Sequence, residues 1–135
     1  MFEVPRTDPR LKNKDEVLGL LLRAGGAAPD APRRAIALSV DFLARHPVHR
    51  LSFAGRDLVV VTSRDGANRV YDTDGVDFKR LLDVGAVEDA QGGRWRVTED
   101  ALVHETTSER RVRVPARRAF WFGWYAQFPD TDLVK

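Results

Sequence analysis

Residues 119–131 of the chain read Ala119-Phe-Trp-Phe-Gly-Trp-Tyr-Ala-Gln-Phe-Pro-Asp-Thr131 and carry six of its twelve aromatic side chains within nine positions. A large aromatic side chain removes roughly 150–250 Å² from water when it packs, so this segment offers more burial per residue than any other part of the sequence. We expect it to form part of the hydrophobic core. The segment explains how the chain folds, and it contains no group of residues typical of catalysis.

The aromatic spacing in this segment is compatible with a helix and with a strand. One helical stripe at the i, i+1, i+4, i+5, i+8 spacing comprises Phe120, Trp121, Trp124, Tyr125 and Phe128. A strand would also place four aromatic side chains on one side, and aromatic residues favour strands. We predict a helix that packs on a sheet and ends at Pro129. Gly123 costs this helix about 1 kcal/mol relative to alanine, so we expect another element to approach closely there.

Length and composition limit the class of protein. A chain of 135 residues, 43% hydrophobic and 31% charged, is typical of one compact domain. The absence of cysteine excludes a disulfide framework, a thiolate zinc site and a nucleophilic thiol. A formal net charge of +2 does not indicate strong nonspecific binding to DNA.

The sequence shows no membrane or export signal. The N-terminus, Met1-Phe-Glu-Val-Pro-Arg-Thr-Asp8, lacks a basic region followed by an apolar run. No segment approaches the roughly 18 apolar residues of a membrane span. We therefore expect a cytoplasmic protein with no membrane partner.

Most of the chain shows the patterns that are typical of β-strands. We predict strands over residues 16–23, 33–40, 49–54, 57–62, 68–71, 94–97, 101–104 and 111–114. The first two are expected to pair as a hairpin. Leu58–Val61 is apolar on both faces, so we expect this strand to be the most covered one in the sheet.

Two short segments differ from this pattern. Residues 41–45 predict a single helical turn. We expect it to end before Pro47, because a residue that precedes proline rarely adopts the helical conformation. Residues 78–82 are compatible with a short helix and with a bulged strand, and the sequence does not separate the two.

The predicted fold class is α+β. Residues 1–14 are polar and are broken by Pro5 and Pro9, which predicts an extended N-terminal arm. Residues 15–135 predict a single domain that is mainly antiparallel β-sheet, with the aromatic C-terminal helix packed on it.

Three segments of the second half of the chain share their order and residues with a known family. They are Asp89-Ala-Gln-Gly-Gly-Arg-Trp95, Phe120-Trp-Phe-Gly-Trp124 and Phe128-Pro-Asp-Thr-Asp-Leu133. Through them the chain resembles the bacterial family called domain of unknown function 3179, and the last two segments are the specific part. Weaker matches to the opening strands of that family are Asp15-Glu-Val-Leu-Gly19, Arg34-Ala-Ile-Ala-Leu38, His46-Pro-Val48, Leu58-Val-Val-Val-Thr62 and Arg69-Val-Tyr71.

The chain departs from this family at one motif. Family members typically carry a Cys-Pro-Leu-Cys motif, sometimes with selenocysteine, after the strand that corresponds to Val59–Thr62. Here that place reads Ser63-Arg-Asp-Gly-Ala-Asn68, so the thiol pair is missing. The resemblance therefore implies no redox chemistry and no cofactor for this chain. It implies an association with exported proteins for full-length relatives, and no established reaction.

Histidines offer one candidate site. His46 and His49 are three residues apart, which could place two imidazoles on one metal ion, and Asp41 lies nearby in the sequence. Pro47 lies between them and disrupts the helix that would align them, so we expect no metal site here. His104, beside Glu105, is expected on an exposed strand face, where an acid–base role would need a pocket.

Charged residues offer two further candidates. Asp72, Asp74, Gly75 and Asp77 are reminiscent of a calcium loop, but the glycine comes too early and no distal glutamate follows, so we expect a turn. A run of arginines that could meet phosphates comprises Arg110, Arg111, Arg113, Arg117 and Arg118. Acidic residues stand beside this run, and charges on an edge strand commonly prevent edge-to-edge pairing. Nucleic acid is therefore not the partner that we expect.

The aromatic segment offers the last candidate, a cleft for a ligand. If one of its rings is exposed, Arg118 and Asp130 would lie at the mouth of that cleft. The candidate ligand-binding residues are His46, Arg118, Trp121, Trp124 and Asp130. We expect a non-catalytic domain that binds a small ligand or a partner protein, or that has a structural role. The alternatives are an enzyme or metal-binding protein that uses His46, His49 and Asp41, and a nucleic-acid-binding module that uses residues 110–118.

Overall fold

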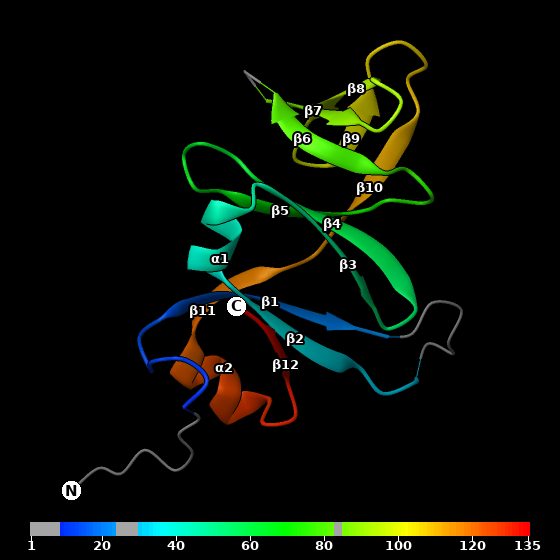
Figure 1. Cartoon of the computed structure of the whole chain (residues 1–135). Helices are drawn as coiled ribbons and strands as arrows, with labels where there is room; N and C mark the ends of the chain where they lie inside the picture. The colour runs from blue at the N-terminus through cyan, green and yellow to red at the C-terminus, as the bar shows by residue number, and fades with distance from the viewer. Residues whose placement is uncertain (1–8, 24–29, 83–84) are drawn as a thin grey trace, which may run out of the picture. The chain divides into compact units, whose positions relative to one another are not determined.

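The computed structural model describes residues 9–23, 30–82 and 85–135 of the chain (Figure 1). They form two compact units, each with a hydrophobic cluster of its own. Unit 1 comprises the described residues of 1–42 and 116–135, and unit 2 comprises those of 43–115. The division into an arm over 1–14 and a single domain over 15–135 stays a prediction, and residues 1–8 of that arm lie outside the described part.

Unit 1 contains a four-stranded sheet in the order β11-β1-β2-β12 (Figure 1). Its strands are β1 (Glu16–Leu22), β2 (Arg34–Ser39), β11 (Arg117–Phe120) and β12 (Asp132–Val134). The predicted hairpin is confirmed, because β1 pairs antiparallel with β2. β1 also pairs antiparallel with β11, whereas β12 runs parallel to β2. Neither β11 nor β12 is predicted from the sequence, because Arg117-Arg-Ala-Phe120 and Asp132-Leu-Val134 show no alternation of apolar and polar residues.

The aromatic segment forms helix α2 (Trp121–Gln127), which packs on the sheet of unit 1. The helix is predicted correctly, but it begins one residue later than the predicted stripe. Phe120 is the last residue of β11, and it is 58% exposed. Trp121 and Trp124 are buried in a cluster with Val17 and Ala37 of the sheet.

The sequence predicts that another element approaches the chain closely at Gly123. This prediction is wrong, because a Cβ atom there would meet nothing within 4 Å. The close approach occurs instead at Gly19 of β1, where a Cβ atom would lie 2.2 Å from the Trp124 ring. The small residue is therefore needed on the strand beneath the helix. It lets the indole of Trp124 lie directly on the β1 backbone.

The chain before β1 lies against the start of α2. The main-chain N–H of Trp121 donates to the Asp15 oxygen at 2.7 Å, and that of Phe122 donates to the Asn13 oxygen at 3.0 Å. The Arg10 guanidinium lies 5.2 Å from the centre of the Trp121 ring. These contacts provide hydrogen-bond partners for N–H groups that a helix start otherwise leaves unpaired.

Helix α1 (Val40–Arg45) confirms the helical turn that the sequence predicts over residues 41–45. The hydroxyl oxygen of Ser39 accepts a hydrogen bond from the Phe42 N–H at 3.3 Å, as an N-cap residue does. The helix ends before Pro47, as expected.

Unit 2 contains an eight-stranded sheet in the order β3-β4-β5-β10-β9-β8-β7-β6 (Figure 1). Its strands are β3 (Val48–Phe53), β4 (Arg56–Thr62), β5 (Asn68–Asp72), β6 (Phe78–Leu82), β7 (Ala86–Asp89), β8 (Arg94–Val97), β9 (Ala101–His104) and β10 (Arg110–Val114). All neighbouring strands in this order are antiparallel. The two end strands, β3 and β6, also contact each other. The sheet therefore curves back on itself.

Most strands of unit 2 match the sequence predictions. Leu58–Val61 is buried throughout, as its apolar pattern predicts. The ambiguous segment over 78–82 is a strand, β6, with a register shift between Phe78 and Arg80. Strand β7 is not predicted, because its four residues include two acidic ones and show no alternation.

The structure confirms a mainly antiparallel β fold with a C-terminal helix. Its longest helix has seven residues. Neither helix of the described residues has the length and apolar content needed to cross a membrane.

Candidate functional site

The structure places the predicted ligand-binding residues in different environments. Trp121 and Trp124 are 0% and 1% exposed, so their rings line no open surface. Arg118 lies on β11, where its guanidinium is 3.3 Å from the Glu16 carboxylate. Asp130 is exposed in the loop after α2. These four residues belong to unit 1, whereas His46 belongs to unit 2 and is exposed directly after α1.

The predicted histidine pair has no further metal ligand. Burial lowers the pKa of His49 on β3, and the charge of His46 lowers it further. Among the described residues, no group of three or more His, Asp or Glu side chains could hold a metal ion. The enzyme or metal-binding alternative through His46, His49 and Asp41 therefore gains no support from the geometry.

Asp89 organises the turn between β7 and β8. Its Oδ1 accepts hydrogen bonds from the N–H groups of Gln91 and Gly93 at 3.0 and 2.8 Å, and its Oδ2 accepts one from Trp95 Nε1 at 2.8 Å. Burial alone would raise the pKa of Asp89, but these hydrogen bonds outweigh burial and lower it. The carboxylate therefore holds the buried Trp95 ring in place.

His104 packs on the same tryptophan. Its ring lies 4.9 Å from that of Trp95 at 81°, an edge-on contact. Its Nδ1 accepts hydrogen bonds from the N–H groups of Thr106 and Thr107 at 3.1 and 3.2 Å. These hydrogen bonds connect the imidazole to the main chain of the turn after β9. His104 therefore links this turn to the buried Trp95 ring.

The predicted arginine run lies on aromatic rings. The guanidinium of Arg111 lies 5.1 Å from the centre of the Trp95 ring, and that of Arg113 lies 5.9 Å from the Tyr71 ring. Arg111 Nε also donates to the Thr73 oxygen at 2.8 Å. Arg111 and Arg113 are therefore each held against an aromatic ring of unit 2. The run is also divided, because residues 110–113 belong to unit 2 and residues 117–118 belong to unit 1.

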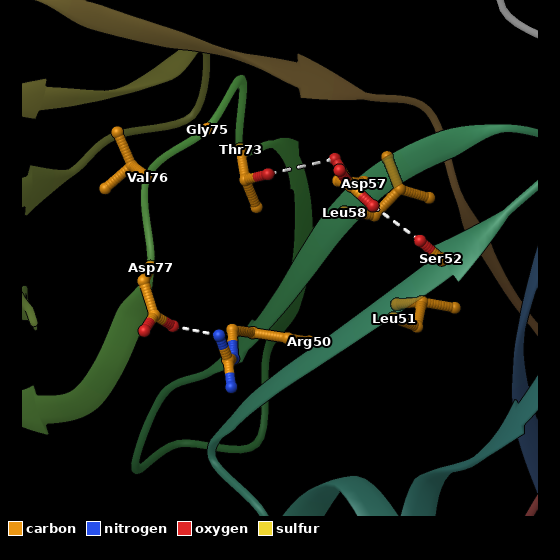
Figure 2. A pocket seen from close by; sticks show the side chains of 9 residues that line it. All are labelled: Arg50, Leu51, Ser52, Asp57, Leu58, Thr73, Gly75, Val76 and Asp77. Atoms are coloured by element: carbon orange, nitrogen blue, oxygen red, sulfur yellow. Dashed lines mark hydrogen bonds and ion pairs between the residues drawn. The ribbon is translucent and has the colours of Figure 1, made fainter.

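Unit 2 has a hollow of about 390 Å³ between β3, β4 and the loop that leads to β6, and we call it the β3 hollow (Figure 2). Its polar side chains bond to one another. Arg50 forms an ion pair with Asp77, and Ser52 donates to the Asp57 carboxylate at 2.5 Å. Thr73 donates to the main-chain oxygen of Asp57 at 3.3 Å. Figure 2 shows these pairs facing each other across the hollow, so a ligand would have to replace existing bonds.

The predicted turn over residues 72–77 borders this hollow. Asp74 and Gly75 have φ values of 43° and 85°, and the Val76 N–H donates to the Thr73 oxygen at 3.0 Å. Asp72 forms an ion pair with Arg56 at 2.9 Å. The segment is therefore a tight turn, as the sequence predicts.

Two further hollows of unit 2 are less suitable as a candidate site. The first, of about 460 Å³, lies around the Arg56–Asp72 pair, and Val112 is its one apolar lining side chain. The second, of about 540 Å³, is lined by Ser63 and Asp65 of the turn where the family carries its thiol pair. Ser63 donates to Asp65 at 2.5 Å. The lining of this hollow also adjoins residues 83–84, which lie outside the described part.

Unit 1 has a hollow of about 500 Å³ at the end of α2, and we call it the α2 hollow. Its apolar lining comprises Leu21, Ala35, Phe128 and Pro129. Its charged lining comprises Arg33, Arg34, Asp130 and Asp132. The chain leaves α2, passes Pro129 and enters β12, which pairs with β2. This route brings the loop after α2 beside the start of β2.

The loop that lines the α2 hollow is held by Thr131. Its hydroxyl accepts a hydrogen bond from Trp124 Nε1 and donates to the Asp132 oxygen, both at 2.9 Å. The Thr131 N–H donates to the Phe128 oxygen at 3.1 Å, and the Thr131 oxygen accepts from Arg10 at 3.2 Å. The loop is therefore ordered before any ligand arrives.

Two of the four charges that line the α2 hollow have no partner among the described residues. Arg34 and Asp132 form an ion pair at 3.3 Å, but both side chains are more than half exposed, so the pair is weak. Arg33 and Asp130 make no hydrogen bond or ion pair within the described part of the chain. Sequence reasoning finds Asp130 but misses Arg33 and Arg34. The only signal for the two arginines is that they are the first two residues of the strand predicted over residues 33–40.

Comparison with known proteins gives a family and no activity. The family model described as "Protein of unknown function (DUF3179)" matches residues 1–131, and the chain belongs to this family. No curated protein and no solved structure matches the chain.

Proposed function

We propose that this member of the unknown-function family is a non-catalytic binding domain that holds a small ligand in the α2 hollow. Arg33 and Asp130, which have no hydrogen bond or ion pair to another described residue and lie beside an apolar lining, are the observation that carries the proposal. Small-molecule sites of about 300–1,000 Å³ typically combine apolar walls with a few polar groups that orient the ligand. At about 500 Å³ the α2 hollow has this composition and size.

The chemistry of the lining favours binding over catalysis. A nucleophilic hydroxyl needs a general base within hydrogen-bond distance, and Thr131 carries the only hydroxyl among the lining residues. That hydroxyl already bonds Trp124 and the Asp132 main chain. No histidine lines the hollow. The groups that remain can bind and orient a ligand by charge and hydrogen bonds.

A fragment screen by NMR tests the proposal. We expect ¹⁵N-labelled protein to show ligands that shift the amide signals of Arg33, Arg34, Asp130 and Asp132. Arg33→Gln and Asp130→Asn should each weaken these ligands about fivefold or more, because each removes one charged contact. Matched controls are Arg96→Gln and Asp100→Asn, exposed residues of unit 2.

Two results would contradict the proposal. One is a screen in which every hit shifts amides of unit 2 and none shifts the α2 hollow. The other is unchanged affinity in both hollow variants. The ¹H–¹⁵N spectrum of each variant checks that the fold is retained.

A further inference from the structure

The charges of the α2 hollow are arranged by sign. Both cations, Arg33 and Arg34, come from the start of β2, and both anions, Asp130 and Asp132, come from the loop after α2 and the start of β12. β2 and β12 are parallel, with Asp132 beside Ile36. The residues that precede these two positions therefore lie at the same end of two neighbouring strands. The Arg34–Asp132 pair at 3.3 Å shows that the two sides come within contact distance there.

This arrangement selects a ligand with two opposite charges. A ligand with a single charge would leave either Arg33 or Asp130 without a partner. A ligand with no apolar part would leave the side chains of Leu21 and Phe128 uncovered. A volume of about 500 Å³ exceeds what one amino acid fills and falls within the range of small-molecule sites.

Building on the proposed function, we infer that the α2 hollow binds a zwitterionic peptide of two or three residues with apolar side chains. The terminal carboxylate pairs with Arg33, since a guanidinium can donate two parallel hydrogen bonds to a carboxylate. The terminal ammonium pairs with Asp130. The apolar side chains cover Leu21 and Phe128.

Four versions of one dipeptide separate these contributions. Leu-Leu carries both charges, N-acetyl-Leu-Leu only the carboxylate, Leu-Leu amide only the ammonium, and N-acetyl-Leu-Leu amide neither. In NMR titrations of the full chain we expect Leu-Leu to bind most tightly at the hollow. Each singly blocked peptide should bind about fivefold to tenfold more weakly, and the doubly blocked peptide most weakly.

Variants assign each terminus to its partner. In Arg33→Gln, blocking the carboxylate should no longer reduce affinity, whereas blocking the ammonium still should. Asp130→Asn should show the reverse. Arg96→Gln and Asp100→Asn should retain all the differences of the unmodified chain. Two results would overturn the assignment. One is that Arg33→Gln removes the effect of blocking the ammonium while Asp130→Asn removes that of blocking the carboxylate, and the other is that both blocking effects are unchanged in both variants.

The results distinguish failure of this inference from failure of the proposed function. If the doubly blocked peptide binds the hollow as tightly as Leu-Leu, the ligand class is wrong while the hollow remains a binding site. The same holds if free leucine binds as tightly as Leu-Leu, because the ligand is then an amino acid. If neither a peptide nor any fragment of the screen shifts the hollow amides, both proposals fail.

Discussion

Gly19 is the residue on which the packing of unit 1 most directly depends. A Cβ atom at this position would lie 2.2–2.6 Å from three ring atoms of Trp124, and that ring is itself buried. Real Cβ atoms do not approach so closely, so the helix or the strand would have to move. The backbone of β1 and the indole thus fit together only because this side chain is absent.

We predict that Gly19→Ala lowers the free energy of unfolding by about 1–3 kcal/mol, as overpacking in a well-packed core does. Gly123→Ala is the matched control, because a Cβ atom there meets nothing and alanine favours the helix by up to about 1 kcal/mol. Urea unfolding of both variants measures the difference. Equal stability of the two variants would show that the contact with Trp124 carries no cost.

Asp89 gives the fold a predictable dependence on pH. Its pKa in the folded state lies below the ordinary value of an aspartate, because Trp95, Gly93 and Gln91 donate hydrogen bonds to the charged form. The folded state therefore binds fewer protons than the unfolded state at acidic pH. The resulting stabilisation is fully present above the unfolded pKa, and it is lost as pH falls through the folded pKa.

We predict that Asp89→Asn is less stable than the unmodified chain at pH 7 and that the difference shrinks as the pH falls below the ordinary aspartate pKa of about 3.9. Urea unfolding at a series of pH values measures both curves. Asp100→Asn, an exposed substitution, provides the control. A difference that stays constant down to pH 2 would show that the carboxylate charge is not what stabilises the turn.

At the level of elements, sequence patterns predict the strands whose residues alternate or are continuously apolar, and fail for the strands that show neither pattern. The buried run of β4 and the Trp95 strand show alternation or continuous apolarity over enough positions to be recognised. β11 and β12 owe their conformation to pairing with β1 and β2, and such pairing is not visible in a segment of three or four residues. The start of α2 is misplaced by one residue for the same reason, since Phe120 pairs with Glu16 as part of β11.

The connection between α2 and β12 depends on one hydroxyl. Thr131 is 4% exposed, and its side chain bonds both Trp124 Nε1 and the Asp132 oxygen. We predict that Thr131→Val costs about 1–3 kcal/mol of stability, because the buried indole N–H loses its acceptor. Thermal or urea unfolding measures the loss, and Thr106→Val, an exposed substitution, is the control. If the variant keeps full stability, the loop is held by other contacts.

In the described part of the chain, several arginines cover aromatic rings, while others form ion pairs with carboxylates. In addition to Arg111 and Arg113, the guanidinium of Arg10 lies over Trp121 and that of Arg117 lies 5.6 Å from the Trp124 ring. A planar guanidinium can stack on a ring and still donate hydrogen bonds at its edge, which a lysine ammonium does less well. Ring contacts and ion pairs thus give several arginines of the described residues a role in the fold.

The candidate site is less predictable from the sequence than the fold. Asp130 is predicted because it follows the aromatic segment, but its neighbours in the α2 hollow come from β2, almost a hundred positions earlier. The parallel pairing of β12 with β2 brings Arg33 and Asp130 to one hollow, and no local pattern encodes that pairing. Trp121 and Trp124 are candidates for a ligand cleft only if one of their rings is exposed, and both are buried. Their size instead makes them core residues.

Hydrogen exchange should show how stability is distributed over the molecule. β4 is paired on both sides and buried from Leu58 to Thr62. The free energy of the opening that exposes its amides to exchange should therefore be among the largest in the molecule. β1, also paired on both sides and buried from Val17 to Leu20, should behave in the same way. β12 has three residues and is paired on one side within the described part, so Leu133 and Val134 should exchange earlier.

We predict that the protection factors of the Val59 and Val60 amides, measured by native-state hydrogen exchange and NMR, exceed those of the β12 amides by about tenfold or more. This order follows because an edge strand can detach without opening the sheet, whereas a central strand cannot. The α2 hollow borders β12, so a ligand that fills it should slow exchange of Leu133 and leave Val60 unchanged. The prediction is contradicted if the amides of β12 and β4 are equally protected without a ligand. That result would mean that contacts other than its pairing with β2 hold β12, and that the α2 hollow is more rigid than its described contacts imply.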